Sequence, residues 1–198
     1  MKKNLFTLII LLILPVMVYA NENSFFTPEI SIGTGVSIYD DKADTARKSI
    51  LDNKDYKRII VGVTADTDLN LSDTIKIILG AEVFSDFLWK GKHYYNSSDY
   101  AFFTGIKIFP NIAGLNFSIA YTLGNRTDYY CILTEEQQSV TRTDSKSWGN
   151  GFRLAVQYNF MQERNYKVKP NVGAYYRCVP RGNYNTDHSL SIYAGVRF

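Results

Sequence analysis

The sequence has few of the residues that most catalytic and metal sites need, since its 198 residues include only two histidines and two cysteines. Two cysteines are too few for the disulfide scaffolds that stabilise small secreted domains. The 22 Lys and Arg are nearly balanced by 19 Asp and Glu, and no basic block occurs, which argues against a nucleic-acid-binding protein. Aromatic residues are abundant, with 15 Tyr and 12 Phe, and this composition indicates a β-rich protein.

The first twenty residues are typical of a secretory signal peptide. Lys2 and Lys3 precede an apolar run over 5–14, and Val18 and Ala20 are the small residues that precede a cleavage site. The apolar run is shorter than the roughly 20 residues of a membrane-spanning helix, which disfavours a retained anchor. We expect cleavage after Ala20, export, and a single mature domain over 21–198.

Most of the mature chain alternates between apolar and polar side chains, which is the period of a β-strand. In the first such segment, Ile30, Ile32 and Val36 alternate with Glu29 and Gly33. The pattern predicts eight strands, over residues 28–39, 55–68, 74–89, 98–109, 115–129, 148–161, 168–179 and 189–198.

The connections between these strands alternate in length. Long polar connections cover 40–54, 90–97, 130–147 and 180–188, and short ones cover 69–73, 110–114 and 162–167. In an up-and-down sheet the two kinds fall at opposite ends, as in transmembrane barrels with long extracellular loops and short periplasmic turns. Both ends of the chain are then expected on the periplasmic side.

Alternation alone does not decide which face is inside, because a soluble barrel turns its apolar face inward and a membrane barrel turns it outward. The polar face here combines charges of both signs with glycines, which suits a narrow bore filled by side chains. Aromatics such as Tyr39, Trp89, Phe109 and Trp148 gather near the predicted strand ends, as they do at membrane interfaces. We therefore predict an interior charge network of Glu29, Arg58, Asp66, Lys76, Glu82, Asp86, Lys107, Arg126, Arg153, Arg177 and Arg197.

The segment Ile192–Phe198, which reads IYAGVRF, resembles the closing strand of small outer-membrane barrels of the OmpA, OmpX and OmpW kind. The resemblance implies an all-β, eight-stranded antiparallel up-and-down transmembrane β-barrel in the outer membrane of a diderm bacterium, surrounded by outer-membrane lipids. It also implies that Phe198 is a C-terminal assembly signal, read by the barrel-insertion machinery.

The sequence favours a non-enzymatic protein with a plugged polar interior and a structural or adhesin-like surface role, with an extracellular ligand reached through loops 40–54 and 130–147. One alternative is a narrow channel for small or hydrophobic solutes, as the OmpW-like resemblance suggests. A second is a surface enzyme that deacylates lipid A, because His188, Ser189 and Ser191 stand together in the sequence. No carboxylate follows them before the end of the chain, so a triad would need a partner from elsewhere.

The sequence predicts no cofactor and no metal site, since His93 and His188 lie far apart and a metal site needs several converging ligands. Cys131 and Cys178 lie near the outer ends of two predicted strands. Export into an oxidising compartment permits a disulfide between them. A third strand lies between theirs, however, so two separate thiols are the alternative.

Overall fold

The computed structural model describes residues 25–39, 55–110, 112–133, 139–145, 148–160, 167–181 and 186–198. The expected signal peptide and the loop 40–54 lie outside these residues. The described residues form nine strands, β1 (Phe26–Tyr39), β2 (Lys57–Asn70), β3 (Ile75–Lys90), β4 (His93–Ile108), β5 (Leu115–Leu133), β6 (Ser139–Ser145), β7 (Gly149–Asn159), β8 (Lys169–Pro180) and β9 (Thr186–Arg197). The described residues contain no helix that is long and apolar enough to cross a membrane.

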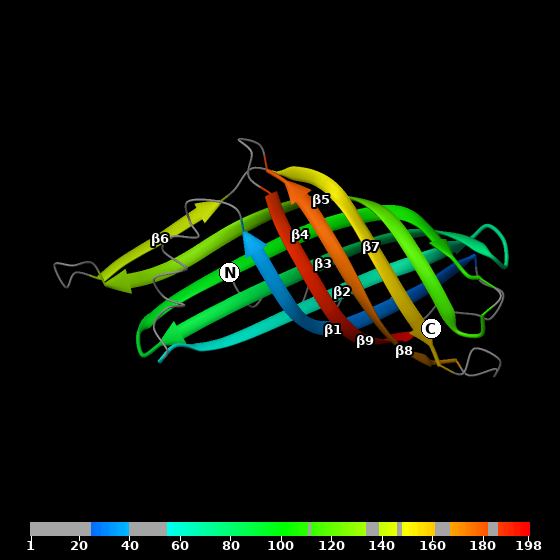
Figure 1. Ribbon diagram of the computed structural model, residues 1–198, viewed down its shortest axis with the longest axis horizontal. Coiled ribbons are helices and arrows are strands. Elements are labelled where there is room, and N and C mark those ends of the chain that lie inside the picture. The colour runs from blue at the N-terminus through cyan, green and yellow to red at the C-terminus, as the bar shows by residue number, and fades with distance from the viewer. Residues whose placement is uncertain are drawn as a thin grey trace.

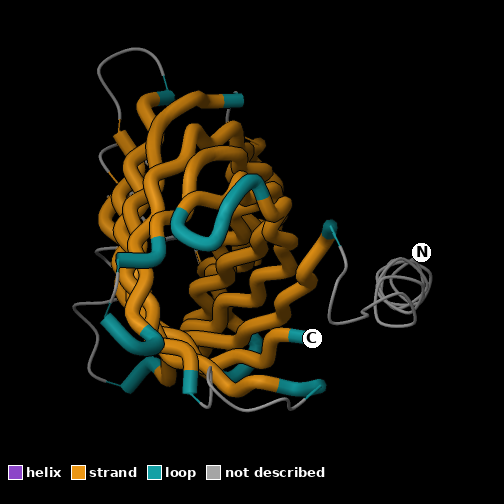
Figure 2. The backbone as a smooth tube through the Cα atoms, turned by 90° about the vertical axis from the view of Figure 1, so that its right-hand side faces the viewer, coloured by secondary structure: helices purple, strands orange, loops and turns teal. Residues whose placement is uncertain are grey.

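Eight of the strands close into an antiparallel barrel, which confirms the predicted fold. Each strand pairs with its neighbour in the order β4, β3, β2, β1, β9, β8, β7, β5, and the pairing of β4 with β5 completes the ring. The strands cross the molecule at a steep tilt (Figure 1), and they form a continuous wall when viewed along the barrel (Figure 2). Such closure gives backbone N–H and C=O groups partners within the sheet.

The apolar face of the barrel points outward and the charged face points inward. Ile59, Leu154 and Ile192 are 51%, 43% and 63% exposed, whereas Arg153 and Glu82 are only 3% and 2% exposed. In a water-soluble barrel these values would be reversed, because apolar side chains would fill the interior. The outer surface is therefore a belt of exposed apolar side chains, which is the pattern of a barrel that spans a membrane.

Two of the predicted long loops are wrong, because the structure places strands there. The loop predicted over 90–97 is a tight hairpin in which only Gly91 and Lys92 lie between β3 and β4, and Gly91 adopts the positive φ of 59° that such a turn requires. Within 130–147, β5 continues to Leu133 and β6 pairs back onto it. Polar residues such as Ser97 suggested a loop, but Ser97 faces inward and donates a hydrogen bond to Asp128.

Two aromatic residues predicted at the membrane interface lie inside the barrel instead. Tyr39 is 3% exposed and Phe109 is 8% exposed. Residues two apart on a strand face the same side. Tyr39 therefore faces inward like Ser37, and Phe109 faces inward like Lys107. By contrast, Trp148 is 56% exposed, in agreement with an outward position.

Strands β1 and β2 form a fork in the barrel wall. They pair from Phe26 to Gly33, with Gly33 opposite Gly62. Beyond that point, residues 34–39 are paired with β9 and residues 57–61 with β3. Thr34 Oγ1 donates a hydrogen bond to the carbonyl oxygen of Ile60 at 2.8 Å where the ladder stops. β1 curves away from β2 toward the end of the barrel opposite the short turns (Figure 1).

Candidate functional site

The middle of the bore is filled by ion pairs that cross from one wall to the other. Glu82 of β3 accepts hydrogen bonds from Arg153 Nε of β7 at 3.2 Å and from Arg177 Nη1 of β8 at 2.6 Å. Arg177 also bonds Asp99 of β4. All four side chains are at most 4% exposed. Because buried charges are stable only when paired, these residues form one interdependent unit, called here the waist.

An aromatic stack completes the waist. The guanidinium carbon of Arg153 lies 4.6 Å from the ring centre of Phe103 and 4.2 Å from that of Tyr175. Phe103 also packs against Ile78 and Ala120, which are both buried. Cation–π contacts of this kind strengthen when water is excluded. The waist therefore occludes the bore with packed side chains.

A second charge cluster lies inside the end of the barrel that carries β6. Arg181 donates to Asp187 at 2.7 Å and to Asp99 at 3.2 Å, so it links this cluster to the waist. Arg126 pairs with Asp187, and its Nε lies 3.3 Å from Asp128 Oδ2. Each of these side chains is at most 4% exposed. The cluster adds a second barrier above the waist.

The rim at the same end carries two more ion pairs. Arg58 donates two parallel hydrogen bonds to the carboxylate of Asp86, at 2.8 and 2.7 Å, which is the strong geometry for a guanidinium. Lys90 lies 2.8 Å from the exposed carboxylate of Asp55. The hydrogen bond from Lys90 lowers the pKa of Asp55, but exposed pairs of this kind contribute little to stability.

A third cluster lies inside the end that carries the short turns. Lys107 Nζ lies 2.9 Å from Asp68, 3.6 Å from Glu29 and 4.0 Å from Asp66. Arg197 Nη2 lies 2.9 Å from the second oxygen of Asp68. One lysine thus holds three carboxylates together, and the arginine of the closing strand shares one of them.

Side-chain amides line the same chamber. Gln157 Nε2 donates to both oxygens of Glu29, at 2.9 and 3.0 Å. Asn116, Asn159 and Asn171 are each at most 3% exposed, yet the Nδ2 of each has no hydrogen-bond partner among the residues that the structure describes. An unpaired buried amide costs about 1–3 kcal/mol, so this end of the bore is a polar chamber suited to buried water.

All the residues of the predicted charge network lie in or beside these clusters. Lys76 is half-buried, with its Nζ 4.8 Å from the ring centre of Phe109, and the guanidinium carbon of Arg197 lies 5.4 Å from the same ring centre. Sequence reasoning missed five partners, Asp68, Asp99, Asp128, Arg181 and Asp187. With them, the network has eight cations (Arg58, Lys76, Lys107, Arg126, Arg153, Arg177, Arg181, Arg197) and eight carboxylates (Glu29, Asp66, Asp68, Glu82, Asp86, Asp99, Asp128, Asp187). The excess of cations in the predicted set was the signal that buried carboxylates were missing.

The cysteines are not joined by a disulfide in this structure. Cys131 pairs with Tyr94 beyond the barrel rim. Cys178 lies within the wall, paired with Phe152 and His188. The two are held apart because the hairpin of β5 and β6 extends away from β8 instead of folding over it.

The proposed catalytic residues of the last strand do not converge. Ser189 and Ser191 are 2% and 1% exposed and face the bore. His188 has the opposite strand parity and faces outward, where its Nδ1 lies 2.7 Å from the hydroxyl of Tyr176. A triad needs its nucleophile and base within hydrogen-bond reach, so His188 does not form one with Ser189 or Ser191 in this arrangement. Among the described residues, no three His, Cys, Asp or Glu are grouped as metal ligands.

An overhanging sheet extends beyond one end of the barrel. β5 pairs with β7 only as far as Gly124. Beyond it, β5 stays paired with β4 as far as Cys131 and pairs with β6 from Thr127 to Leu133. The hairpin of β5 and β6 projects from the end opposite the short turns (Figure 1). At its base, Leu88 and Tyr95 are buried and pack against Tyr130, whose ring stacks on Tyr95 at 6.0 Å.

Comparisons with known proteins show the fold. Neither a protein-family model nor a curated protein matches the sequence. Two solved structures of Ail, the attachment invasion locus protein of Yersinia pestis, match with TM-scores of 0.57 and 0.53, the second in complex with the heparin analogue sucrose octasulfate. Each is 12% identical and covers 88% of this chain and 100% of Ail. Neisserial surface protein A matches with a TM-score of 0.47 and 11% identity, covering 88% of this chain and 96% of its own. The chain has the fold of small eight-stranded outer-membrane β-barrels.

Proposed function

We propose that this protein is an outer-membrane barrel that binds a partner at the cell surface through its overhanging sheet. Three observations support the proposal. The apolar belt suits a membrane, the bore is occluded at the waist, and the sheet extends past the rim at the end where long loops were expected. We further propose that residues 1–20 are removed on export, that barrel-insertion machinery assembles the protein, and that Phe198 is its assembly signal.

The open edge of β6 carries this proposal. Among the described residues, β6 is paired within the sheet only with β5, and we infer that backbone groups along its other edge are available to a partner. An exposed edge strand is a template on which an extended peptide can add a further strand. The core formed by Leu88, Tyr95 and Tyr130 supports the base of the sheet, so the edge is held by a rigid element. We infer that the partner is an extended polypeptide.

The comparison with Ail adds support for ligand binding at a surface of this fold. One of the Ail structures is a complex with sucrose octasulfate, so a barrel of this kind binds a polyanionic ligand. The rim of the present chain is mixed in charge, with Lys90 paired to Asp55 and Asp144 on β6. Backbone pairing at an open edge is therefore better supported here than recognition of a polyanion.

The test is display of the full protein on a non-adherent bacterium, followed by adhesion to immobilised extracellular-matrix proteins. In the trimmed variant, residues 129–145 are replaced by a two-residue Asn-Gly turn. We expect adhesion by the native protein and its loss on trimming, with the heat-shifted electrophoretic band of a folded barrel retained in both. A control variant carries substitutions in the short turn 71–74 at the other end, and it should adhere normally. Equal adhesion by trimmed and native protein would refute the proposal.

Two single substitutions sharpen this test. Along an antiparallel strand, the N–H groups of consecutive residues point to opposite edges. Proline removes one such N–H group, so Thr143→Pro and Asp144→Pro affect different edges of β6. One of them should loosen the hairpin by breaking a bond to β5, and the other should block adhesion while the hairpin stays paired. Adhesion that survives both substitutions would exclude pairing at the edge of β6. Inhibition of adhesion by added sucrose octasulfate would instead indicate a site for a polyanion.

The channel alternative has less support. The guanidinium of Arg153, held between two rings, and the carboxylate of Glu82 occupy the middle of the bore. A solute would have to displace buried ion pairs, which cost several kcal/mol when broken.

A further inference from the structure

Three side-chain amides lie next to one another on the inner wall at the short-turn end, and they are called here the amide row. Asn159 of β7 pairs in register with Asn171 of β8, and Asn116 of β5 lies diagonally beside Asn159, because its own register partner is Gln157. All three are at most 3% exposed, and the Nδ2 of each has no hydrogen-bond partner among the described residues. The amide row therefore offers N–H donors to the bore from three neighbouring strands.

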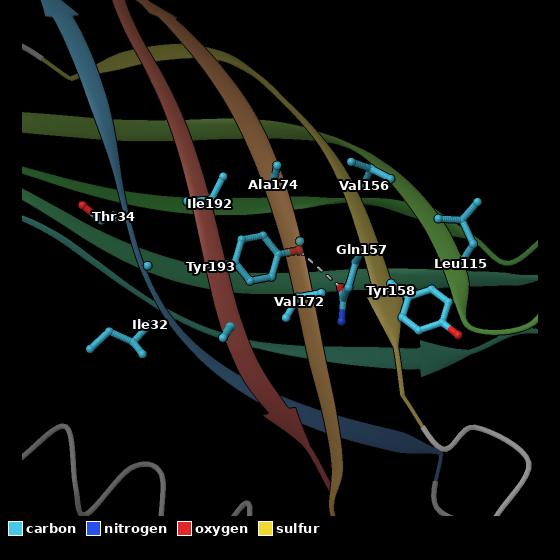
Figure 3. A pocket seen from close by; sticks show the side chains of 13 residues that line it. Ile32, Thr34, Leu115, Val156, Gln157, Tyr158, Val172, Ala174, Ile192 and Tyr193 are labelled. Atoms are coloured by element: carbon cyan, nitrogen blue, oxygen red, sulfur yellow. Dashed lines mark hydrogen bonds between the residues drawn. The ribbon is translucent and has the colours of Figure 1, made fainter.

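The orientation of the middle amide is fixed by its neighbours. Gln157 Nε2 donates to Asn159 Oδ1 at 2.8 Å and to both oxygens of Glu29. The hydroxyl of Tyr193 donates to Gln157 Oε1 at 3.4 Å (Figure 3). Because the carbonyl oxygen of Asn159 already accepts a hydrogen bond, its NH2 group is the end left for a further partner. That partner must be an acceptor, since an NH2 group only donates.

Two cross-strand pairs of like charge lie at the same end of the bore. Lys169 of β8 pairs in register with Arg197 of β9, and Lys76 of β3 pairs with Lys107 of β4. Lys169 is two residues from the buried Asn171 on the same strand, so it faces the bore. Like charges directly opposite each other on neighbouring strands destabilise a sheet. A bound negative charge would relieve this repulsion.

Carboxylates offset only part of the positive charge. Lys107 and Arg197 each lie 2.9 Å from an oxygen of Asp68. Lys76 contacts the ring of an aromatic residue, but neither it nor Lys169 has an ion-pair partner among the residues that the structure describes. The bore-facing side chains at this end have one more cation than carboxylates (Lys76, Lys107, Lys169, Arg197, Glu29, Asp66, Asp68).

The size and the charge of the site favour a small monoanion. The amides are almost fully buried, so a partner must be about as small as the buried water that such a polar chamber otherwise holds. A chloride ion is only slightly larger than water, accepts several N–H groups at once, and brings the single negative charge that balances the excess. A water molecule accepts at most two hydrogen bonds and brings no charge. A phosphate dianion would exceed the excess and would meet the nearby carboxylates.

We propose that the short-turn end of the bore binds one chloride ion, held by the amide row and by Lys169. The Nδ2 groups of Asn116, Asn159 and Asn171 donate to the ion, and the ammonium groups of Lys169 and Lys76 supply the charge that no carboxylate offsets. Both lysines are half-buried, so the ion enters from the short-turn end, because the waist closes the other side. The bound ion joins β5, β7 and β8 and stabilises the barrel.

The first test measures chloride binding to the full protein, folded in micelles of an uncharged detergent, by chlorine-35 NMR. Exchange of chloride with a protein site broadens its signal. Sodium chloride is exchanged for the sodium salt of a bulky sulfonate at constant ionic strength, so that screening of the other charges does not change. We expect the native protein to broaden the chloride signal in a saturable way. No broadening by the folded native protein would overturn the proposal.

Three variants locate the site. Asn171→Asp places a carboxylate in the amide row and should abolish chloride binding. Lys169→Gln removes one positive charge and should weaken chloride binding about ten-fold, the effect of losing one charge-assisted hydrogen bond. Lys167→Gln is the matched control, because Lys167 is an exposed lysine whose loss changes the net charge by the same amount. It should bind chloride like the native protein.

Unfolding in urea separates a bound ion from a general effect of salt. For one site, the unfolding constant falls in proportion to chloride above the dissociation constant. Ten times more chloride should therefore lower it about ten-fold in the native protein and in Lys167→Gln, and should leave Asn171→Asp unchanged. The heat-shifted band shows which variants fold, and Lys169→Gln decides the question if Asn171→Asp does not. Equal broadening and equal chloride dependence in Lys169→Gln and Lys167→Gln would overturn the proposal and assign water to the amide row.

Discussion

Glu82 offers the most direct test of the occluded bore. Its two carboxylate oxygens accept separate hydrogen bonds, from Arg153 at 3.2 Å and Arg177 at 2.6 Å, and its side chain is fully buried. Substitution by Gln keeps the shape but removes the charge that compensates two guanidinium groups. Arg177 retains its ion pair with Asp99, whereas Arg153 loses its ion-pair partner Glu82 and keeps its contacts with the faces of two aromatic rings.

We expect Glu82→Gln to lower the free energy of unfolding by about 3 kcal/mol, the lower end of the range for breaking a buried ion pair. This is more than a hundred-fold change in the unfolding equilibrium. The assay is reversible urea unfolding in detergent micelles or lipid vesicles, followed by tryptophan fluorescence. Two tryptophans, Trp89 and Trp148, provide the signal.

The double substitution Glu82→Met with Arg153→Met separates electrostatics from packing. It removes one charge of each sign, and replacing a buried pair by apolar residues is often neutral or stabilising. We therefore expect the double variant to be more stable than Glu82→Gln. A loss below about 0.5 kcal/mol for Glu82→Gln would mean that the waist is hydrated enough to screen the charges. A double variant less stable than the single one would show that the ion pair itself, and not relief from an unpaired charge, stabilises the barrel.

Three further outcomes follow from the wall, the thiols and the bore. Leu79→Lys places a charge on the apolar belt and should cost about 2–4 kcal/mol in a bilayer; a neutral effect in unfolding experiments would contradict an outward, lipid-facing Leu79. Because Cys131 and Cys178 are not bonded, the native protein should migrate identically on denaturing gels with and without reductant, and faster migration of the oxidised sample would show a disulfide. Planar-bilayer recordings should show no steady conductance for the native protein, because the waist and the cluster of Arg126, Arg181 and Asp187 both fill the bore. Open-channel current from the native protein would refute occlusion at the waist.

The barrel and its orientation were predictable because strand periodicity acts on every residue. In β3, Ile75, Leu79 and Val83 face outward while Lys76 and Glu82 face inward. Because this alternation repeats along the whole strand, a single exception does not obscure it. A closed sheet then follows from the need to pair every backbone group in hydrocarbon.

The missing parts of the charge network lay where periodicity is weak or was not extended. Asp99 lies on β4, where both faces of the predicted strand 98–109 are rather apolar, with Ala101 on one and Phe102 on the other, so the inward face was not distinct. Asp187 and Arg181 lay in a segment assigned to a loop, and only the three-dimensional structure brings Arg181 from the end of β8 to Asp99 of β4.

The overhanging sheet was missed for a different physical reason. Outside the membrane both faces of a strand meet water, so Thr141, Thr143 and Ser145 need not alternate with apolar residues. Pairing with β5 holds β6 in place, and backbone hydrogen bonds leave no mark on the sequence. Sequence reasoning therefore located the segment that we propose to bind a partner at the surface, but not its strand structure.

The fork between β1 and β2 gives the barrel a zone of unequal amide protection. Beyond Gly33 and Gly62 the two strands no longer share a ladder, so each has one neighbour there where other wall strands have two. Deuterium should therefore enter residues 34–39 and 57–61 well before it enters the fully laddered β3 and β4. Breathing of the barrel would then begin at this seam, and the rest of the wall would open only with global unfolding.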